Sequence, residues 1–256
     1  MVTNDKLIYG LIGKKLSHSF SRQFFSHKFE EEQIDAEYLN FELPTIEHLK
    51  DIIASHPTLK GLNVTIPYKE EVIPLLDELS PEAEAIGAVN VIKIEHLNDG
   101  SIRLIGHNTD VIGFRESIRP LLTSNHTKAM ILGTGGASKA VEHALRSLDI
   151  EVQFVSRSHD KSSMTYSDLT DDIIIDHKVI VNTTPLGMYP NTMVMPDIIY
   201  YALTEEHLCY DLVYNPEKTM FLIACEAHGA QIKNGIEMLI LQAEESWKIW
   251  NNKIQQ

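Results

Sequence analysis

Cysteine is scarce in this 256-residue chain, which has only Cys209 and Cys225, in no CxxC or zinc-ligand spacing. This scarcity excludes a disulfide-stapled secreted domain and favours a reducing compartment. The opening stretch MVTNDKLIYG lacks the basic-then-apolar order of a secretory signal, so we expect a cytoplasmic protein. Long apolar runs are also missing, since none approaches the roughly 20 residues of a membrane span.

Basic residues are few relative to acidic ones: 22 Lys and Arg against 36 Asp and Glu give a formal net charge of -14. This balance argues against nonspecific binding to nucleic acid or to an anionic membrane. The 12 histidines form no HxxxH pair and no His/Cys cluster, so we predict scattered surface histidines and no metal site. Hydrophobic residues make up 43% of the chain, which allows a core in one large or two modest domains.

The first half of the chain alternates strand-like and helix-like patterns. We predict strands at 7–13, 36–43 and 61–67, and helices at 20–32, 46–55 and 68–79, the last bent or broken at Pro74. Residues 88–106 are typical of a hairpin that turns at Asn-Asp-Gly. This alternation predicts a mostly parallel α/β sheet with a hairpin at its edge.

The second half begins after a polar stretch at 120–128, the best candidate for a linker. Residues 129–158 then follow the order strand, Gly-rich turn, amphipathic helix, strand. Further strands, each followed by a loop, are expected at 178–190 and 208–216. We therefore predict two α/β domains joined near residue 120.

The turn GTGGAS at 133–138 is a variant of the dinucleotide fingerprint. Gly133 permits a tight turn, and Gly135 lets backbone N–H groups approach a pyrophosphate at the helix N-terminus. Ser138 stands where the usual pattern has Gly or Ala. Because the motif follows a strand and opens a helix, it indicates a nucleotide site, the alternative being a purely structural turn.

The end of the next strand bears on the choice of cofactor. An acidic residue there would bind the ribose of NAD, whereas Arg accommodates the 2′-phosphate of NADP. This chain has Ser156, Arg157 and Ser158 at that point, followed by Lys161, and the nearby acid Asp160 lies past the strand end. A guanidinium and two hydroxyls suit a phosphate, so NADP is favoured over NAD. The alternative is that Arg157 and Lys161 are only solvated side chains on a loop.

Polar residues also gather at predicted strand ends in the first half, where α/β proteins bind ligands. They are Asn63, Thr65 and Lys69 in NVTIPYK, Asn90 in GAVN, and Asn108 and Asp110 in GHNTD. Each alone has a plain structural explanation: a turn Asn, a surface Lys or a helix-capping Asp. Together, beside a nucleotide fold, they predict a pocket for a polyol.

Three serines, Ser17, Ser19 and Ser21, alternate where a predicted strand gives way to a helix. Hydroxyls and the orphan N–H groups of a helix start can hold an anion such as a carboxylate. We assign that role to the first two serines. Ser21 is expected to be a helix cap or a first-turn residue.

These motifs in this order resemble those of the shikimate dehydrogenase family over nearly the whole chain. They are SHS (17–19), NVTIPYK (63–69), GAVN (87–90), NTD (108–110), GTGGAS (133–138), SRS (156–158), NTTPLGM (182–188), DLVYNP (211–216) and GIEMLILQ (235–242). That family reduces 3-dehydroshikimate to shikimate with NADPH on the way to aromatic amino acids. The resemblance implies a substrate-binding domain at 1–120 and a Rossmann-like NADP-binding domain at 121–235, separated by a cleft, with a C-terminal helix at 236–256 that packs back on the first domain.

The resemblance also implies a role for each matching residue. Lys69 and Asp110 would be catalytic, with Lys69 as the acid/base group. The substrate would contact Ser17, Ser19, Asn63, Thr65, Lys69, Asn90, Asp110, Tyr214 and Gln242. NADP would contact Gly133, Thr134, Gly135, Gly136, Ala137, Ser156, Arg157, Ser158, Lys161, Thr183, Leu212 and Gly235. Many relatives have Asn-Arg-Thr in place of Ser156-Arg157-Ser158, a change that weakens the grip on the adenosine end without abolishing it.

Three other readings stay open at this point. One is a quinate/shikimate dehydrogenase that uses NAD, which needs room for an extra ring hydroxyl. Another is a non-catalytic sensor of shikimate-like acids, which the presence of both Lys69 and Asp110 disfavours. The third is a Rossmann enzyme acting on another small acid. The expected partner in every case is a small molecule, bound by a monomer or a homodimer.

Overall fold

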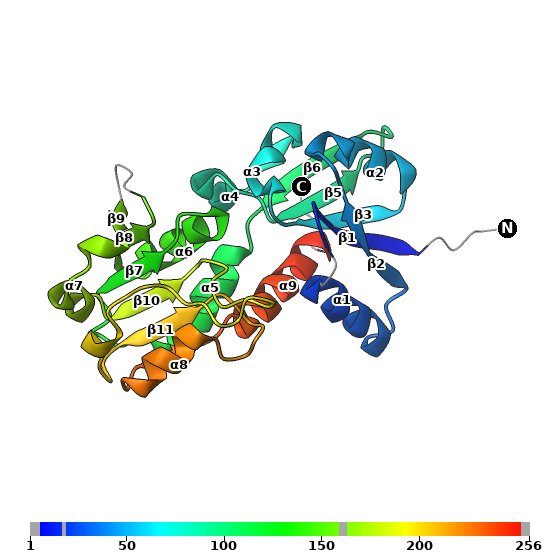
Figure 1. Cartoon of the computed structure of the whole chain (residues 1–256). Coiled ribbons are helices and arrows are strands. Elements are labelled where there is room, and N and C mark those ends of the chain that lie inside the picture. The colour runs from blue at the N-terminus through cyan, green and yellow to red at the C-terminus, as the bar shows by residue number, and fades with distance from the viewer. Residues whose placement is uncertain (1–5, 17–18, 159–162, 252–256) are drawn as a thin grey trace. The chain divides into compact units, whose positions relative to one another are not determined.

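The computed structural model describes residues 6–16, 19–158 and 163–251, and it divides into two compact units. Unit 1 comprises Met1–Thr109 and Gln242–Gln256, and unit 2 comprises Asp110–Leu241. Each unit has its own six-stranded sheet (Figure 1). Within the described ranges no helix is long and apolar enough to cross a membrane. No cluster of His, Cys, Asp or Glu side chains in those same ranges could hold a metal ion.

The sheet of unit 1 has the strand order β2-β1-β3-β5-β6-β4. Its strands are β1 (Leu7–Gly13), β2 (Ala36–Glu42), β3 (Leu59–Val64), β4 (Glu78–Leu79), β5 (Val91–His96) and β6 (Ile102–His107). Its helices are α1 (Phe20–Glu31), α2 (Leu49–Ser55), α3 (Tyr68–Glu71) and α4 (Pro81–Ile86), with short 3-10 turns at Ile46–His48 and Ile73–Leu75. β1 runs parallel to β2 and β3, so their C-terminal ends share one edge of the sheet.

The second half of the last helix, α9 (Ile236–Asn251), belongs to unit 1 and is anchored on its sheet. The indole N–H of Trp250 donates to the carbonyl oxygen of Ile92 at 3.1 Å. The ring lies against Gly61, where an added Cβ would be 2.2 Å from it, so only glycine admits the ring here. Phe25 of α1 packs on the same ring, with centroids 5.3 Å apart. This aromatic cluster fixes the part of α9 that carries Gln242.

Unit 2 has the strand order β12-β11-β10-β7-β8-β9, and all of its pairs are parallel. Its strands are β7 (Lys128–Leu132), β8 (Glu151–Ser156), β9 (Ser163–Thr165), β10 (Val179–Asn182), β11 (Leu208–Asp211) and β12 (Gln231–Lys233). Its helices are α5 (Asp110–Ile118), α6 (Gly136–Arg146), α7 (Asp171–Asp176), α8 (Met220–Ala227) and the start of α9, with 3-10 turns at Arg119–Leu121, Tyr166–Asp168 and Tyr200–Ala202. This order, with the first strand β7 in the middle, is that of a Rossmann fold and confirms the predicted class.

The boundaries between the units differ from the predicted residues 120 and 235. The first lies after Thr109, because α5 joins unit 2: Phe114 packs edge-on against Tyr210 with centroids 4.9 Å apart, and Ser117 hydrogen-bonds the same phenol at 2.8 Å. The second lies inside α9, between Leu241 and Gln242, since one continuous helix contributes to both units.

Two local predictions in unit 1 were also wrong. Residues 68–79, predicted as a helix bent or broken at Pro74, form α3 and the 3-10 turn at Ile73–Leu75, but the stretch ends in the strand β4 and not in a helix. The hairpin of β5 and β6 is not at the edge of the sheet, because β4 pairs with β6 on its outer side. The helix α4 was not predicted, although its signals are present. Ser80 caps its start, Pro81 is its first residue, and Gly87 ends it at φ 68°.

Candidate functional site

A hydrogen-bonded cluster in unit 1 joins three of the predicted substrate residues, beginning with Asn63 of β3. The Asn63 side-chain oxygen accepts a hydrogen bond from the Tyr38 hydroxyl at 2.7 Å. Its amide nitrogen donates to the Ser246 hydroxyl at 3.1 Å and lies 3.5 Å from the Asn90 carbonyl oxygen. Both the oxygen and the nitrogen of the Asn63 side-chain amide are therefore hydrogen-bonded.

The second centre of this cluster is Asn90, which is 4% exposed. Its side-chain oxygen accepts from the backbone N–H of Thr109 at 2.7 Å. Its amide nitrogen donates to the Thr109 hydroxyl at 3.1 Å and to the side-chain oxygen of Gln242 at 3.3 Å. Since an amide oxygen of Gln242 faces Asn90, its amide nitrogen is the end left to point elsewhere.

Three members of the cluster were missed from the sequence: Tyr38, Thr109 and Ser246. Ser246 lies one helical turn beyond Gln242, a spacing that does place both on one face of a helix. Thr109 stands inside the NTD motif, between two residues that drew attention. Tyr38 carries no local signal, because its contact with Asn63 spans 25 residues of the chain.

Thr65 and Lys69 follow β3 at the shared strand edge. The backbone N–H of Thr65 donates to the Ile12 carbonyl oxygen at 3.0 Å, which continues the pairing of β3 with β1. Lys69 lies in α3, half-buried, and its carbonyl oxygen accepts from the Val89 N–H at 2.7 Å. The buried Tyr68 beside it donates its hydroxyl proton to the Leu43 carbonyl oxygen at 2.6 Å. These bonds fix the backbone from which the Lys69 ammonium extends.

The three serines are only partly placed. Ser17 lies outside the described residues. Ser19 is the N-cap of α1, and its hydroxyl oxygen accepts from the Arg22 N–H at 3.1 Å. A capping hydroxyl still has its proton to donate, so this role is compatible with holding a carboxylate. Ser21 lies in the first turn of α1, one of the two positions expected for it, and its side chain hydrogen-bonds Tyr38.

Asn108 and Asp110 flank Thr109 where β6 passes into α5. The Asn108 amide donates to the Ala88 carbonyl oxygen at 2.9 Å, a buried bond across 20 residues of the chain and not the local turn bond that was its plain explanation. Asp110 is the first residue of α5 and is 4% exposed. It follows directly on Thr109, so the hydrogen bonds between Thr109 and Asn90 also fix the backbone next to Asp110.

In unit 2 the Gly-rich turn forms a cradle between β7 and α6. Gly133 has φ 105°, a conformation that favours glycine, and an added Cβ would approach the Thr183 hydroxyl at 3.0 Å. Gly135 is the N-cap of α6 and provides no side-chain cap, and an added Cβ at Gly135 or Gly136 would meet no atom within 4 Å. The first turn of α6 thus has open space beside Gly135 and Gly136, and a helix start with free N–H groups beside such space fits a dinucleotide pyrophosphate. Thr134 lies in the turn, and Ala137 is the second residue of α6.

The predicted phosphate-binding residues follow β8. Ser156 ends the strand, and its hydroxyl donates to the Ser158 carbonyl oxygen while accepting from the Ser158 N–H at 3.3 Å. Both bonds fold the chain tightly around Arg157, whose side chain is exposed. An exposed guanidinium at this strand end fits the 2′-phosphate of NADP. Lys161 lies outside the described residues.

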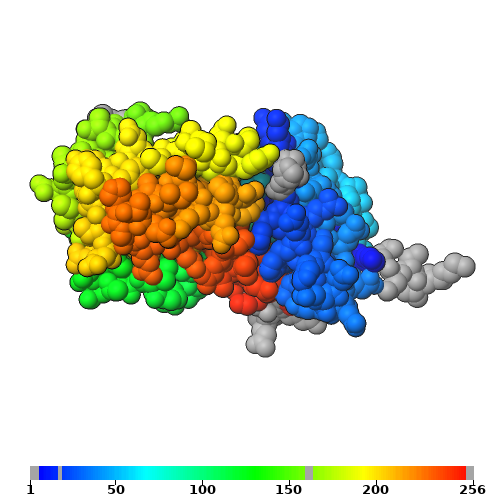
Figure 2. All heavy atoms as spheres, turned by 60° about the horizontal axis from the view of Figure 1, so that its bottom comes forward, coloured from blue at the N-terminus to red at the C-terminus, as the bar shows by residue number. Residues whose placement is uncertain are grey.

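A buried carboxylate organises the loops after β10 and β11. Asp211, 0% exposed, accepts from the Asn182 amide and the Val213 N–H, both at 3.0 Å, and from the Thr219 hydroxyl at 2.5 Å. The loop after β10 lies beside α8, as Figure 2 shows in yellow and orange, and the Tyr189 N–H donates to the Asn215 carbonyl oxygen at 3.1 Å. Asp211 thus ties together the loops that begin with Thr183 and Leu212.

The remaining predicted residues of unit 2 lie around these loops. Gly235 faces Leu212 so closely that an added Cβ would be 2.2 Å from the Leu212 carbonyl oxygen. Thr183 donates its hydroxyl proton to the Leu132 carbonyl oxygen at 2.8 Å, at the end of β7. Leu212 after β11 and Gly235 after β12, both predicted for the nicotinamide side, are therefore in contact. Tyr214 is half-buried on the same loop, and burial raises the pKa of its phenol.

Burial raises the pKa of Asp211 to about 6, against the three donors that lower it. The folded state therefore holds the Asp211 proton more firmly than the unfolded state does, and stability falls as the pH rises from about 4 to 6. The expected loss at this one group is about 3 kcal/mol. Urea unfolding of the wild type and of Asp211→Asn between pH 4 and 7 measures it. As the pH rises from 4 to 7, the wild type should lose this amount of unfolding free energy relative to Asp211→Asn. A difference between the two proteins that does not change with pH would contradict the assignment.

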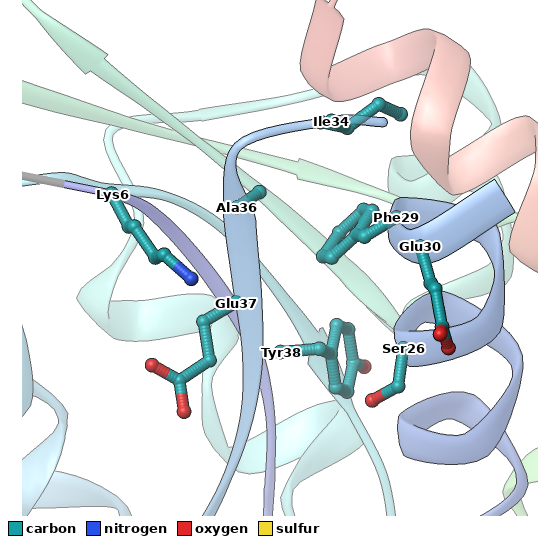
Figure 3. A pocket seen from close by; sticks show the side chains of 8 residues that line it. All are labelled: Lys6, Ser26, Phe29, Glu30, Ile34, Ala36, Glu37 and Tyr38. Atoms are coloured by element: carbon teal, nitrogen blue, oxygen red, sulfur yellow. The ribbon is translucent and has the colours of Figure 1, made fainter. Parts of the chain in front are cut away.

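A separate pocket of about 270 Å³ lies in unit 1 between α1 and β2 (Figure 3). Its lining includes Ser26 and Glu30 of α1 and Glu37 and Tyr38 of β2. It contains none of the residues predicted to bind substrate or cofactor. The pocket and the polar cluster share Tyr38, which lines the pocket and whose hydroxyl donates a hydrogen bond to Asn63.

The sequence is similar to those of known proteins along nearly its whole length. Residues 11–92, in unit 1, match the model of the shikimate dehydrogenase substrate binding domain. The chain is 37% identical over 272 aligned positions to shikimate dehydrogenase (NADP(+)) from Methanosphaera stadtmanae, covering 99% of this chain and 94% of the relative.

Solved structures agree as well. The chain resembles shikimate 5-dehydrogenase from Thermus thermophilus in complex with NADP(H) and shikimate, with a TM-score of 0.82, 29% identity, and 96% of this chain and 93% of that one covered. It also resembles quinate dehydrogenase from Corynebacterium glutamicum in complex with NAD, with a TM-score of 0.83, 28% identity, and 97% and 94% covered. The full-length identity to the curated relative shows that the chain belongs to the shikimate dehydrogenase family, with the activity of a shikimate dehydrogenase (NADP(+)), an oxidoreductase of aromatic amino acid biosynthesis.

Proposed function

We propose that the polar cluster of unit 1 is the shikimate pocket. The observation that carries this proposal is the hydrogen-bonded set of Asn63, Asn90 and Gln242, three residues brought together from β3, the approach to β5 and α9. Their amides suit the ring hydroxyls. The carboxylate of the substrate is assigned to Ser17, Ser19, Thr65 and Tyr214.

Lys69 is the catalytic residue that we assign to proton transfer. Reduction of a ketone needs a hydride on carbon, which NADPH supplies when bound, and a proton on the oxygen. The Lys69 ammonium stabilises the developing negative charge and donates that proton. In the reverse direction the neutral amine accepts it. Asp110 is the carboxylate that we assign to keeping the lysine charged, since a nearby negative charge favours an ammonium.

NADP is assigned to the cradle of unit 2. The N–H groups of residues 133–137 hold the pyrophosphate, and Thr183, Leu212 and Gly235 line the nicotinamide side. The adenosine 2′-phosphate is assigned to Ser156, Arg157, Ser158 and Lys161. The open space beside Gly135 and Gly136 supports this assignment.

Replacing Arg157 with alanine tests the choice of NADP. Because only NADP carries the 2′-phosphate, the variant should raise the KM for NADP by about 10- to 100-fold, as expected when a charged hydrogen-bond partner is lost, and leave the KM for NAD unchanged. Steady-state assays at saturating shikimate give both values. Arg146→Ala, which removes an exposed arginine of α6, serves as the matched control. Equal KM changes for both cofactors in Arg157→Ala would contradict the assignment.

A quinate dehydrogenase that uses NAD is the second candidate function. The likeness to such an enzyme from Corynebacterium glutamicum favours it. Against it stand the exposed Arg157 at the end of β8 and the lack of an acidic residue within Ser156–Ser158. The substrate panel that closes the Discussion separates the two candidates.

Cytoplasmic location and a monomeric or homodimeric state complete the proposal. The support for the location is that Cys209 and Cys225, both buried, are free thiols rather than a disulfide, as suits a reducing compartment. Sedimentation of the purified protein at several concentrations measures the oligomeric state. A species larger than a dimer would contradict this part of the proposal.

A further inference from the structure

We propose that Ser246 is a positioning residue of the shikimate pocket, which orients the side-chain amide of Asn63. This inference rests on the proposed function, in which Asn63 contacts the substrate. Ser246 lies in the half of α9 that belongs to unit 1, and it is 0% exposed. It therefore acts on the substrate only through the residues that it touches.

The hydroxyl of Ser246 is set as an acceptor toward Asn63. A serine hydroxyl has one proton and two acceptor positions. Its proton is donated to the Gln242 carbonyl oxygen one turn earlier, at 2.7 Å. The oxygen then accepts from the Asn63 amide nitrogen at 3.1 Å, and the Thr109 hydroxyl lies 3.4 Å away. An acceptor at this place requires that the nitrogen end of the Asn63 amide face α9.

The opposite end of the same amide is set by Tyr38. Burial raises the pKa of this phenol well above its ordinary value, so it keeps its proton. That proton is donated to the Asn63 side-chain oxygen at 2.7 Å. Ser21 of α1 hydrogen-bonds the Tyr38 hydroxyl in turn. A donor on one side and an acceptor on the other admit only one of the two amide orientations.

The orientation has a consequence for recognition. Both protons of the Asn63 amide nitrogen face acceptors, in Ser246 and in the Asn90 carbonyl oxygen, whereas its side-chain oxygen has one lone pair beyond the bond from Tyr38. Asn63 therefore offers a substrate hydroxyl an acceptor. Gln242, whose oxygen accepts from Asn90, offers donors through its amide nitrogen. The pocket thus presents an acceptor, the Asn63 amide oxygen, and a donor, the Gln242 amide nitrogen. Ser246 keeps the Asn63 amide in the orientation that makes it an acceptor.

The variant Ser246→Ala tests this role in the full-length protein. Without its acceptor, the Asn63 amide loses its fixed orientation, and the KM for shikimate should rise about tenfold, the effect expected for an unmade buried hydrogen bond. The KM for NADP should stay the same, and kcat should change by less than about threefold. A residue that only stabilises the fold would lower the melting temperature and leave the KM for shikimate unchanged.

Ser117→Ala is the matched control. Ser117 is also a buried helical serine, it donates to the Phe114 carbonyl oxygen at 2.9 Å, and it hydrogen-bonds Tyr210, all within unit 2. This control should lose stability to a similar degree and keep the wild-type KM for shikimate. A wild-type KM in Ser246→Ala overturns the inference, as does an equal rise in both variants.

A double-mutant cycle shows whether Ser246 acts through Asn63. In the Asn63→Ala background, Ser246→Ala should raise the KM for shikimate by less than twofold, and a further tenfold rise overturns the inference. If Ser246→Ala does not fold, Tyr38→Phe replaces it, since it removes the donor on the other side of the same amide, and a wild-type KM there overturns the inference. If Asn63→Ala itself leaves the KM unchanged while the wild type is active, the assignment of Asn63 to the pocket falls and the inference with it. If the wild type does not turn over shikimate, the proposed function fails first.

Discussion

Replacing Lys69 with alanine is expected to lower kcat for shikimate oxidation by about 10²- to 10⁴-fold, the usual contribution of general acid–base catalysis. The KM for shikimate should change far less, because Asn63, Asn90 and Gln242 remain hydrogen-bonded to one another. The fold should be retained, since the buried Tyr68 and the Lys69 backbone, which the variant keeps, hold α3 in place. Steady-state kinetics at saturating NADP separate kcat from KM.

Two further lysine variants sharpen the result. Lys69→Arg keeps the positive charge but provides a guanidinium that does not give up its proton near neutral pH, so kcat should stay low. Lys50→Ala removes an exposed lysine of α2 in the same unit and should behave as the wild type. A kcat for Lys69→Ala within tenfold of the wild type would show that this lysine is not the proton donor.

Replacing Gly235 with alanine is expected to destabilise unit 2 and to weaken NADP binding together. The new Cβ would lie 2.2 Å from the Leu212 carbonyl oxygen, and a backbone atom cannot rotate away as a side chain can. The chain must shift, at a cost of about 3 kcal/mol by analogy with overpacked cores. For a protein of this size the melting temperature should fall by about 6–12 °C. The KM for NADP should rise because Leu212 is part of the nicotinamide side.

Gly135→Ala is the matched comparison, because it adds the same methyl group at another glycine of unit 2. Here a Cβ meets no atom within 4 Å, and φ is -79°, which any residue adopts. Stability should fall by about 1 kcal/mol or less, as for alanine at an N-cap. The KM for NADP should nevertheless rise, because the methyl group occupies the space that the pyrophosphate needs. Wild-type NADP binding in this variant would show that the cradle is not used.

The Rossmann half was the more predictable of the two units. Residues 129–158 carry their pattern locally, since the strand, the Gly-rich turn and the helix follow one another within 30 residues, and β7, α6 and β8 confirm it. The boundary at Thr109 was not predictable in this way. It depends on Phe114 and Ser117 packing against Tyr210, more than 90 residues away, whereas the polar stretch at 120–128 only leads into β7.

The candidate site shows the same limit. Asn63, Asn90 and Gln242 stand out as polar residues near strand ends or in a recognised motif, and the structure brings them together. Their geometry depends on Tyr38 and Ser246, and the latter contact spans 183 residues of the chain. Motifs and their spacing in the sequence predict which polar side chains belong to a candidate site. The orientation of an amide depends on distant partners, which spacing does not reveal.

The most direct measurement is the initial rate of absorbance change at 340 nm with purified protein, for shikimate and quinate, each with NADP and with NAD. The account predicts rapid turnover with shikimate and NADP, and much lower kcat/KM with NAD or with quinate. A preference for quinate and NAD would contradict it and support the second candidate function. Binding of shikimate without turnover of any pair would contradict it too, and would assign the chain to sensing rather than to catalysis.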